Sequence, residues 1–348
     1  MVQHYPALSR PLQPVCSVCI ANYNGVDLLA DCIDSILAQA GDIEVEIIVH
    51  DDASNDDSVA WLRARYPQVE LLASAENVGF CVGNNRMAAH ARGEFLLLFN
   101  NDAALAPDAL ATLLQLARAS EHGAVLTLPQ YDWTCGTLVD RGCLLDPFYN
   151  PVPNLDAARA QVAMTIGACL WIAREAWNAI GGFPEWMESI GEDLYVCCAA
   201  RLRGASVRCA PGSGYRHRQG HSFGGNRASG GLSTTFRRRR LSERNKTAVL
   251  FICTPSFAMW PLLWLHLLAL GGEGLLLAAI KRDGKIWSEI YAPAIASPWR
   301  NAAAWGRHRR EMQQQRKATL GSYFHQFTPL LRKIRLLMAF GIPQVRGR

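Results

Sequence analysis

Segments of strand character alternate with segments of helical character from Val15 to Leu128. Within residues 28–39, Leu29, Ile33 and Ile36 fall on one stripe with a period of about 3.6 residues, which indicates a helix. Strands that alternate with helices pair mostly in parallel through right-handed crossovers. We therefore predict an α/β fold with a Rossmann-like, mostly parallel sheet flanked by helices. The predicted strands are Val15–Asn22, Glu44–His50, Val69–Ala73, Phe95–Phe99 and Ala124–Leu128, and the predicted helices are Leu28–Gln39, Ser58–Arg65, about Asn84–Ala91 and about Pro107–Ala119.

The pattern changes after this first series. Residues 129–160 have the turn residues and broken patterning of a long connection. A strand, two helices and a further strand are then predicted, and glycine and basic residues crowd the segment 212–240, which we expect to be a mobile loop. These later elements are predicted at Val162–Ile172, Glu175–Ile180, Leu194–Arg203 and Ser206–Ala210.

The last third of the chain differs from the rest in its net charge and in its content of apolar residues. Residues 1–236 carry 15 Lys and Arg against 25 Asp and Glu, whereas residues 237–348 carry 20 against 5. The apolar segment Ala248–Leu270 is 23 residues long, is interrupted by Pro255 and Pro261, and follows the basic run Arg237–Arg240. Prolines, tryptophans and basic flanks favour a helix pair lying on an anionic membrane surface. A single membrane span and a helix pair packed in water remain open.

The sequence also bears on a nucleic acid partner and on the cellular compartment. No nucleic-acid-binding motif accompanies the basic run, so we expect no nucleic acid partner. The eleven cysteines are scattered and mostly in apolar contexts, which is typical of reduced cytosolic thiols. The start of the chain, MVQHYPALSRPLQP, lacks the apolar run of a secretory signal. These features predict a cytoplasmic protein.

The segment FLLLFNND, which ends in Asp102, carries the first candidate site. An apolar strand of this kind is buried on both faces, and its polar end lies at the carboxyl edge of the sheet, where open α/β folds bind ligands. Asn101 and Asp102 offer oxygen atoms there that suit a divalent cation. Taken alone, the same residues fit a polar turn after a core strand.

Two further polar clusters follow neighbouring predicted strands. The first is Asn22-Tyr23-Asn24-Gly25, and the second begins with Asp51 and Asp52. Carboxylates at this edge can accept hydrogen bonds from a pyrimidine N–H or from ribose hydroxyls, although an Asx turn and helix cap explain the second cluster equally well. A third segment has glycines at positions 79 and 83 followed by Asn84, where the backbone can approach a ligand at a helix N-terminus; an ordinary strand-to-helix turn is the alternative.

Together, the ordered blocks NYNG, DDASND, ENVGFCVGNNRMAAHARGE and FLLLFNND resemble glycosyltransferase family 2, whose members have the GT-A fold. The resemblance covers residues 15–225 approximately. It implies inverting transfer of a sugar from a nucleotide-sugar, with Asp51 near the base, Asp52 and Asn84 near the nucleoside, and Asp102 on Mn²⁺ or Mg²⁺ bound by the diphosphate. Asn100 stands where the first Asp of the family's metal motif usually lies.

The second half of the chain supports the same resemblance. The segment ACLWIAREAWNAIGGFPE resembles the family's acceptor side, and Glu192-Asp193 follows it at the place of the family's ED motif. The match implies that Asp193 is the general base and that Glu192 orients the acceptor; two acids at a helix N-terminus need no catalytic role. His217 stands where family members carry a histidine that ligates the metal or contacts the diphosphate, and an exposed loop histidine is the alternative.

We therefore expect a peripheral enzyme on the cytoplasmic face of a bacterial membrane that transfers sugars to a lipid-linked glycan, similar to rhamnosyltransferase-like members of the family. A sugar-nucleotide pyrophosphorylase and an inactive membrane scaffold of the same ancestry remain alternatives. The expected domains are an extension at 1–14, a catalytic domain at 15–236, divided at residue 128 into nucleotide-sugar and acceptor halves, and a membrane-associating region at 237–348. The predicted nucleotide-sugar-binding residues are Asn22, Tyr23, Asn24, Asp51, Asp52, Gly83, Asn84 and Asn101.

Overall fold

The computed structural model describes residues 2–121, 123–218 and 232–346. The chain divides into two compact units, which are described separately. Unit 1 comprises residues 1–143, 153–196 and 205–219, and unit 2 comprises residues 144–152, 197–204 and 220–348. Residues 219–231 of the predicted mobile loop at 212–240 lie outside the described residues, and its described parts include the strands Tyr215–His217 and Ser233–Thr235 and the start of a helix at Phe236.

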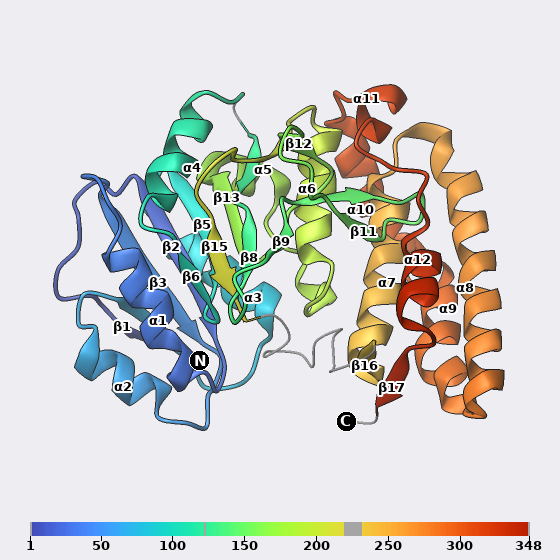
Figure 1. Ribbon diagram of the computed structural model, residues 1–348, viewed down its shortest axis with the longest axis horizontal. Coiled ribbons are helices and arrows are strands. Elements are labelled where there is room, and N and C mark those ends of the chain that lie inside the picture. Colours follow the sequence, from blue (N-terminus) through green and yellow to red (C-terminus); the bar gives the residue numbers. More distant parts are fainter. Residues whose placement is uncertain (1, 122, 219–231, 347–348) are drawn as a thin grey trace. The chain divides into compact units, whose positions relative to one another are not determined.

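A nine-stranded mixed sheet forms the centre of unit 1 (Figure 1). Four strands in its first half, β2 to β5, pair in parallel, as the alternating sequence pattern predicts. The second half is mixed, because β13 runs antiparallel to both β5 and β7. In spatial order the strands are β1 (Val2–Tyr5), β4 (Glu70–Ser74), β3 (Val45–Asp51), β2 (Cys16–Asn22), β5 (Phe95–Asn100), β13 (Cys169–Ala173), β7 (Val125–Thr127), β14 (Val207–Cys209) and β12 (Gln161–Val162).

Helices cover this sheet, and their apolar residues join its apolar strands in one core. The core includes Leu29 and Ile33 of α1 and Leu110 of α4, packed with Val18 and Leu97 of the sheet. All eleven cysteines are free, and only Cys135 is exposed, so these thiols serve mainly as small core residues. The helices of unit 1 are α1 (Val26–Leu37), α2 (Ser58–Arg65), α3 (Phe80–His90), α4 (Ala109–Arg118) and α5 (Arg174–Ile180), and α6 (Glu192–Leu202) begins in it.

Three sequence predictions differ from the structure of this unit. Residues 2–5, assigned to an N-terminal extension, pair as edge strand β1 with β4. The predicted strand Val162–Ile172 is two strands, because the chain turns at Gly167 and Cys169 N donates to the Ile166 carbonyl at 3.3 Å. The predicted connection 129–160 contains short strands, two of which join a second, four-stranded sheet. That sheet contains β6 (Ala103–Leu105), β15 (Tyr215–His217), β8 (Gln130–Asp132) and β9 (Leu138–Asp140), and β10 (Cys143–Leu145) pairs with β11 (Pro151–Pro153).

Unit 2 is mainly helical. The apolar segment that begins at Ala248 is divided at Pro255, where α7 has ended and α8 has not begun, because proline cannot continue a helix from the preceding turn. Pro261 lies in the first turn of α8, where proline is tolerated. The helices are α7 (Phe236–Cys253), α8 (Met259–Lys281), a π-helical segment (Ile286–Tyr291), α9 (Ala292–Arg300), α10 (Ala302–Gln314), α11 (Leu320–Phe324) and α12 (Arg332–Phe340), with β16 (Ser233–Thr235) and β17 (Gln344–Arg346) paired in parallel.

Candidate active site

Three parallel strands of unit 1 end at one edge of the sheet and bring the predicted polar clusters together. In the register of these strands, Asn22 at the end of β2 lies opposite Asp51 at the end of β3. On the other side of β2, Ala21 lies opposite Asn100 at the end of β5. The sequence blocks that follow the three strands therefore share one edge, as predicted from the rule for parallel strands.

Asn22 forms hydrogen bonds with residues at the ends of both neighbouring strands at this edge. Its side-chain amide donates to Asp51 Oδ2 at 2.9 Å, and its Oδ1 accepts a hydrogen bond from Asn101 Nδ2 at 2.8 Å. A Cβ on Gly25 would lie 2.3 Å from Asn101 Nδ2, so a larger residue at position 25 would displace this contact. Asn22 thus joins the ends of β3 and β5, and Gly25 leaves the space for it.

Ser54 holds the loop after β3 against the loop after β2. Its backbone N–H and hydroxyl donate to Asp51 at 3.0 and 2.7 Å, and its hydroxyl oxygen accepts the Asn24 N–H at 2.9 Å. Asn24 Oδ1 in turn accepts the backbone N–H of Asn55 at 2.7 Å. Tyr23, between the bonded residues 22 and 24, is 50% exposed, which leaves its ring available to a ligand.

Asp52 fixes the glycine-containing loop that precedes α3. Its two carboxylate oxygens accept the backbone N–H groups of Val78 and Gly79 at 2.7 and 2.9 Å. Gly79 has a φ of 88°, a backbone conformation that side chains other than glycine rarely adopt. Each oxygen has a second lone pair, so Asp52 can hold this loop and still accept a hydrogen bond from a ligand.

The structure places Gly83 and Asn84 differently from the sequence prediction. Because α3 begins at Phe80, Asn84 lies in its second turn and not at its N-terminus. The Asn84 side chain is buried and donates to the Phe80 carbonyl at 2.9 Å. A Cβ on Gly83 would lie 2.9 Å from Nδ1 of His50, so this glycine permits close packing of α3 on β3.

Asp102 and His217 form a buried pair beside the end of β5. Asp102 Oδ1 and His217 Nε2 are 3.0 Å apart, and the side chains are 2% and 10% exposed. His217 reaches Asp102 because β15 pairs antiparallel with β6, which places His217 opposite Ala103. Asn100 Nδ2 lies 3.4 Å from the same imidazole nitrogen, and His217 Nδ1 has no hydrogen-bond partner among the described residues.

The spacing of this pair fits two neighbouring ligands of a divalent cation. Oxygen and nitrogen ligands about 2.1 Å from a Mg²⁺-sized ion lie about 3 Å apart when they occupy adjacent octahedral positions. A carboxylate and an imidazole are suitable donors for Mn²⁺. Within the described residues, no group of three His, Cys, Asp or Glu side chains could hold a metal. Asp102 and His217 would therefore need further ligands from a bound diphosphate.

Glu192 and Asp193 lie in the first turn of α6. Asp193 Oδ2 accepts the backbone N–H of Gly167 at 3.0 Å, and Glu192 is buried. Burial, followed by the charges of these two carboxylates and of neighbouring acids, raises the pKa of the Cys81 thiol on α3. The first turn of α6 and the start of α3 are therefore close enough to share one negative electrostatic environment.

The segment that leads into the reversed strand β13 connects Asp193 to the Asp102–His217 pair. The carbonyl of Ala168, just before β13, accepts the backbone N–H of Asn100 at 3.2 Å, and Ala168 follows the Gly167 that Asp193 holds. Asn100 in turn contacts His217, the partner of Asp102. Asp193 and Asp102, 91 residues apart in sequence, are thus joined through a short series of contacts at one sheet edge.

Asp140 on β9 is a buried acid near this edge that the sequence did not indicate. Its Oδ1 accepts the Gly142 N–H at 2.9 Å, while Oδ2 is buried without a hydrogen-bond partner in the part of the chain that the structure describes. Burial raises the pKa of Asp140 to about 6, and the charge of His217 opposes that shift only in part. Gly25 and Ser54 lie in the predicted clusters NYNG and DDASND, but the sequence assigned them no role, because serine and glycine in turns carry no specific signal.

A mixed sheet flanked by helices, with a parallel half and a reversed strand beside it, is the fold of GT-A glycosyltransferases. The solved structure described as GalNAc-T7 with UDP, GalNAc and Mn²⁺ has a similar fold, with a TM-score of 0.51, 16% identity, and coverage of 58% of this chain and 43% of that one. Residues 17–180 match the model described as Glycosyl transferase family 2. These residues therefore form a glycosyltransferase family 2 domain, which confirms the predicted family and fold class.

Curated relatives match over different lengths. The N-acetylglucosaminyl-diphospho-decaprenol L-rhamnosyltransferase of Mycobacterium tuberculosis is 24% identical over 66% of this chain and 81% of its own length. The succinoglycan biosynthesis protein ExoO of Rhizobium meliloti is 32% identical over 36% of this chain and 35% of its own length. Two uncharacterized relatives are matched over only 25% and 33% of their length, so this chain spans a minor part of several relatives.

Proposed function

We propose that this chain is an inverting, metal-dependent glycosyltransferase that moves a sugar from a nucleotide-sugar to a lipid-linked glycan in bacterial surface polysaccharide synthesis. The observation that carries the proposal is the position of Asp193 and the Asp102–His217 pair at one edge of the sheet. An inverting transfer needs a base on the acceptor side and charge compensation on the diphosphate side, and these residues can supply both.

The nucleoside would lie over the edge formed by β2 and β3. Asp51 and Asp52 keep acceptor lone pairs for the base and ribose, and the half-exposed Tyr23 can contact the ring of the base. The name of the similar GalNAc-T7 structure includes UDP, which supports a nucleotide at this edge. The proposed binding set is Asn22, Tyr23, Asn24, Asp51, Asp52 and Asn101. Gly83 and Asn84, predicted for the same set, are buried within α3 and are left out of it.

Asp102 and His217 would hold a Mn²⁺ or Mg²⁺ ion against the diphosphate. A bound cation compensates the negative charge that develops on the leaving nucleoside diphosphate. Asp193 accepts the proton of the acceptor hydroxyl while that oxygen forms its bond to C1 of the sugar. The bond from C1 to the diphosphate oxygen breaks, and its electron pair leaves with the nucleotide. Glu192 would orient the acceptor beside Asp193.

The acceptor and the location of the chain belong to the same proposal. The name of the mycobacterial relative specifies a sugar transferred to a diphospho-decaprenol glycan, which supports a lipid-linked acceptor here. ExoO supports a role in polysaccharide synthesis. We propose unit 1 as the catalytic domain, in place of the predicted range 15–236, and the helical residues 237–348 of unit 2 as a membrane-associating region, peripheral on the cytoplasmic face of the membrane.

The test is release of nucleoside diphosphate from a panel of UDP-, dTDP- and GDP-sugars by the purified chain with Mn²⁺ or Mg²⁺. We expect slow hydrolysis of one nucleotide class in the absence of acceptor, which EDTA abolishes and which Asp102→Ala lowers by about a hundredfold or more. The matched control, Asp42→Ala, replaces an exposed aspartate that has no assigned contact and should hydrolyse the donor at the parent rate.

Hydrolysis that is indifferent to both EDTA and Asp102→Ala would refute the metal role. The two alternatives give different products: a pyrophosphorylase forms nucleoside triphosphate when sugar nucleotide and pyrophosphate are supplied, and an inactive scaffold releases no nucleotide from any member of the panel. Either outcome would replace the proposed function.

A further inference from the structure

The outer face of α8 in unit 2 is apolar and exposed. Its large exposed side chains are 52% to 70% exposed and recur at helical spacing, so they form one stripe, which we call the α8 stripe. The helix has 23 residues, which corresponds to a length of about 35 Å. A stable monomer in water rarely exposes an apolar patch of this length. The stripe consists of Trp260, Trp264, Leu265, Leu268, Leu275 and Leu276.

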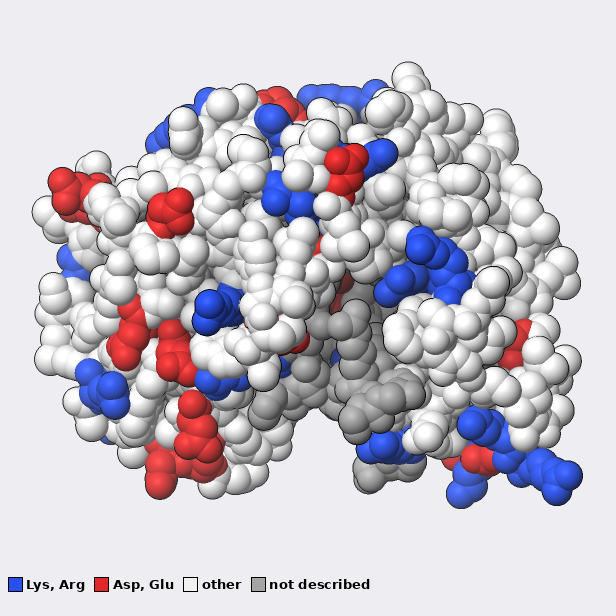
Figure 2. Space-filling model, viewed as in Figure 1, with Lys and Arg blue, Asp and Glu red and all other residues white. Residues whose placement is uncertain are grey.

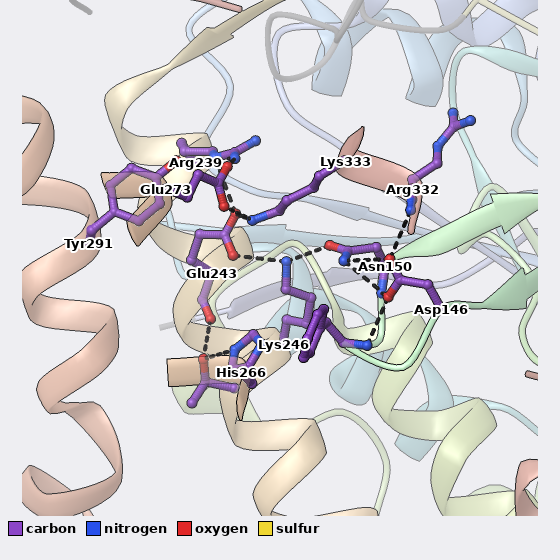
Figure 3. A network of polar contacts seen from close by, with 12 residues as sticks. Asp146, Asn150, Arg239, Glu243, Lys246, His266, Glu273, Tyr291, Arg332 and Lys333 are labelled. Carbon is purple, nitrogen blue, oxygen red and sulfur yellow. Dashed lines mark hydrogen bonds and ion pairs between the residues drawn. The ribbon is translucent and has the colours of Figure 1, made fainter. Parts of the chain in front are cut away.

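A different face of α8 contacts a network of charged side chains from α7 and α12 (Figure 3). Glu273 of α8 pairs with Arg239 of α7 and with Lys333 of α12, whose Nζ lies 2.6 Å from Glu273 Oε2. Glu273 also accepts a hydrogen bond from the Tyr291 hydroxyl at 3.0 Å. The helix is therefore held to α7 and α12 by charge, and its buried leucines pack against the π-helical segment.

Glu243 on α7 belongs to the same charged network. It is 1% exposed and pairs with Lys246 at 2.8 Å, Lys333 at 2.7 Å and Arg239 at 3.1 Å. Burial alone would raise the pKa of Glu243, but the three cations together lower it well below its ordinary value. These side chains are thus ionised partners of one another, and removing one partner leaves the others with uncompensated buried charge.

The network argues against a membrane-spanning α8. Of the described helices, the one that includes Ser256–Lys281 is long and apolar enough to cross a bilayer, and a third of it is buried in the protein. If it crossed, Glu273 and its partners on α7 and α12 would enter the hydrocarbon region or separate. Either change moves several charges out of water or away from their partners, which costs several kcal/mol per ion.

The side chains around the α8 stripe suit an anionic bilayer surface. Trp264 contacts Trp299 of α9, with ring centroids 6.0 Å apart, and Trp299 is 56% exposed. Tryptophan is enriched at the boundary between headgroups and acyl chains. Lys281, Arg282 and Lys285 are exposed at the C-terminal end of α8. In Figure 2 the margin of the molecule over α8 carries few charged atoms, whereas basic atoms gather near its end.

We propose that α8 lies flat in the headgroup region of an anionic bilayer, with the α8 stripe inserted toward the acyl chains and both of its ends on the same side of the membrane. The proposal shares its membrane partner with the proposed function. It rests on the geometry of unit 2 alone, however, and therefore stands or fails independently of sugar transfer.

Flotation of the full chain with sealed phosphatidylglycerol–phosphatidylethanolamine vesicles tests the surface. The double variant Leu268→Glu/Leu276→Glu adds two charges to the stripe and should lower vesicle binding by about a hundredfold, since each buried leucine contributes about tenfold or more. The matched control is Leu8→Glu/Leu155→Glu, which changes exposed leucines of unit 1 and should float like the parent. Phosphatidylcholine vesicles should bind the parent at least fivefold more weakly.

Equal flotation of the parent and the stripe variant would overturn the proposal, and so would equal losses in the stripe variant and its control. A parent that fails to float but sediments as a dimer, with the stripe variant a monomer, would assign the stripe to a second copy of the chain and also overturn it. Because these leucines are exposed, circular dichroism of the variants should match that of the parent.

The orientation has its own test. In a Cys135→Ser background, which removes the exposed thiol among the described cysteines, Phe257→Cys and Lys281→Cys each place one thiol near an end of α8. A membrane-impermeant maleimide added outside sealed vesicles should label both variants to the same extent, within about twofold. Labelling of one variant at less than a tenth of the other would indicate a spanning helix and overturn the proposal.

Discussion

The aspartates at the proposed nucleotide site organise the protein before any ligand binds. Asp52 receives two backbone N–H groups from the loop before α3, and Asp51 receives the side chains of Asn22 and Ser54. These contacts hold three separate segments in place at the sheet edge. A ligand that binds there meets polar groups already in position, which lowers the ordering cost of binding.

Asp193→Asn tests the proposed base. The amide can keep the hydrogen bond to the Gly167 N–H through its oxygen, but it cannot accept a proton from the acceptor. We expect kcat for sugar transfer to fall by about a thousandfold, while KM for the nucleotide-sugar changes by less than about threefold. Steady-state kinetics with a competent acceptor would measure both constants.

The exposed Asp42→Asn provides the control for this substitution and should retain the parental kcat. Retention of full turnover by Asp193→Asn would exclude it as the base. An increase in KM for the nucleotide-sugar without a change in kcat would instead assign Asp193 to substrate binding.

Asp140 should make the stability of the protein depend on pH. Its folded-state pKa of about 6 lies above the ordinary value of 3.8, so the folded protein binds the proton more tightly than the unfolded chain. The free energy of unfolding therefore falls as the pH rises from about 4 to about 6, by about 3 kcal/mol in total. Asp140→Asn removes this loss. Urea unfolding should show the variant gaining about 3 kcal/mol relative to the parent between pH 4 and pH 7.5.

The exposed Asp42→Asn variant should show a much smaller pH-dependent difference from the parent. If the difference between Asp140→Asn and the parent were the same at both pH values, the buried carboxyl would not carry the shifted pKa.

The polar residues of the site differed in how well the sequence predicted them. Asn22, Asp51 and Asp102 follow apolar strands, so their common edge follows from strand direction alone. The pairing of His217 with Asp102 depends on β15 and β6, which are three residues each and give almost no periodic signal. Ser54, Gly25 and Asp140 act through contacts between segments distant in sequence, which a local pattern does not encode.

Among the elements, α8 depends on close approach at one glycine. A Cβ on Gly274 would lie 2.5 Å from Cγ of Tyr291, whereas a Cβ on Gly272 meets no atom within 4 Å. Gly274→Ala should therefore force α8 away from the π-helical segment and destabilise the protein by about 1–3 kcal/mol. Gly272→Ala should stabilise it by up to about 1 kcal/mol through helix propensity. Urea midpoints of the two variants would measure both effects.

Opposite signs for this matched pair would support packing as the function of Gly274. Equal shifts in the same direction would show that both glycines act only through backbone propensity.

Long periodic elements were predicted well, and short or broken ones were not. The helix predicted at Leu28–Gln39 is α1, and the buried run from Phe95 is β5. The apolar residues 162–172 were read as one strand, because a turn at Gly167 inside an apolar run leaves hydrophobicity unchanged. The start of α3 was placed too late, since Phe80, Cys81 and Val82 lack polar partners that would reveal a helical stripe.

For the whole molecule, the sequence predicted the α/β class and the parallel half of the sheet, because strands there alternate with helices. It did not predict the mixed half, whose strands are two to five residues long and are joined by irregular segments. The net charge of residues 237–348 predicted an anionic partner. The proposed membrane-contact surface could be located only with the structure, because the charges of the Glu243 network pair with one another and the exposed α8 stripe is apolar.

Strand β13 has a consequence for how such enzymes can diversify. It runs against its neighbours, so the chain segment that enters it arrives at the same rim where β2, β3 and β5 finish. Under the proposed function, the acceptor and the nucleotide-sugar would therefore meet at one edge of a single sheet. Mutation or recombination in the segments leading into β13 could change which alcohol is glycosylated while the parallel strands continue to recognise the same activated sugar.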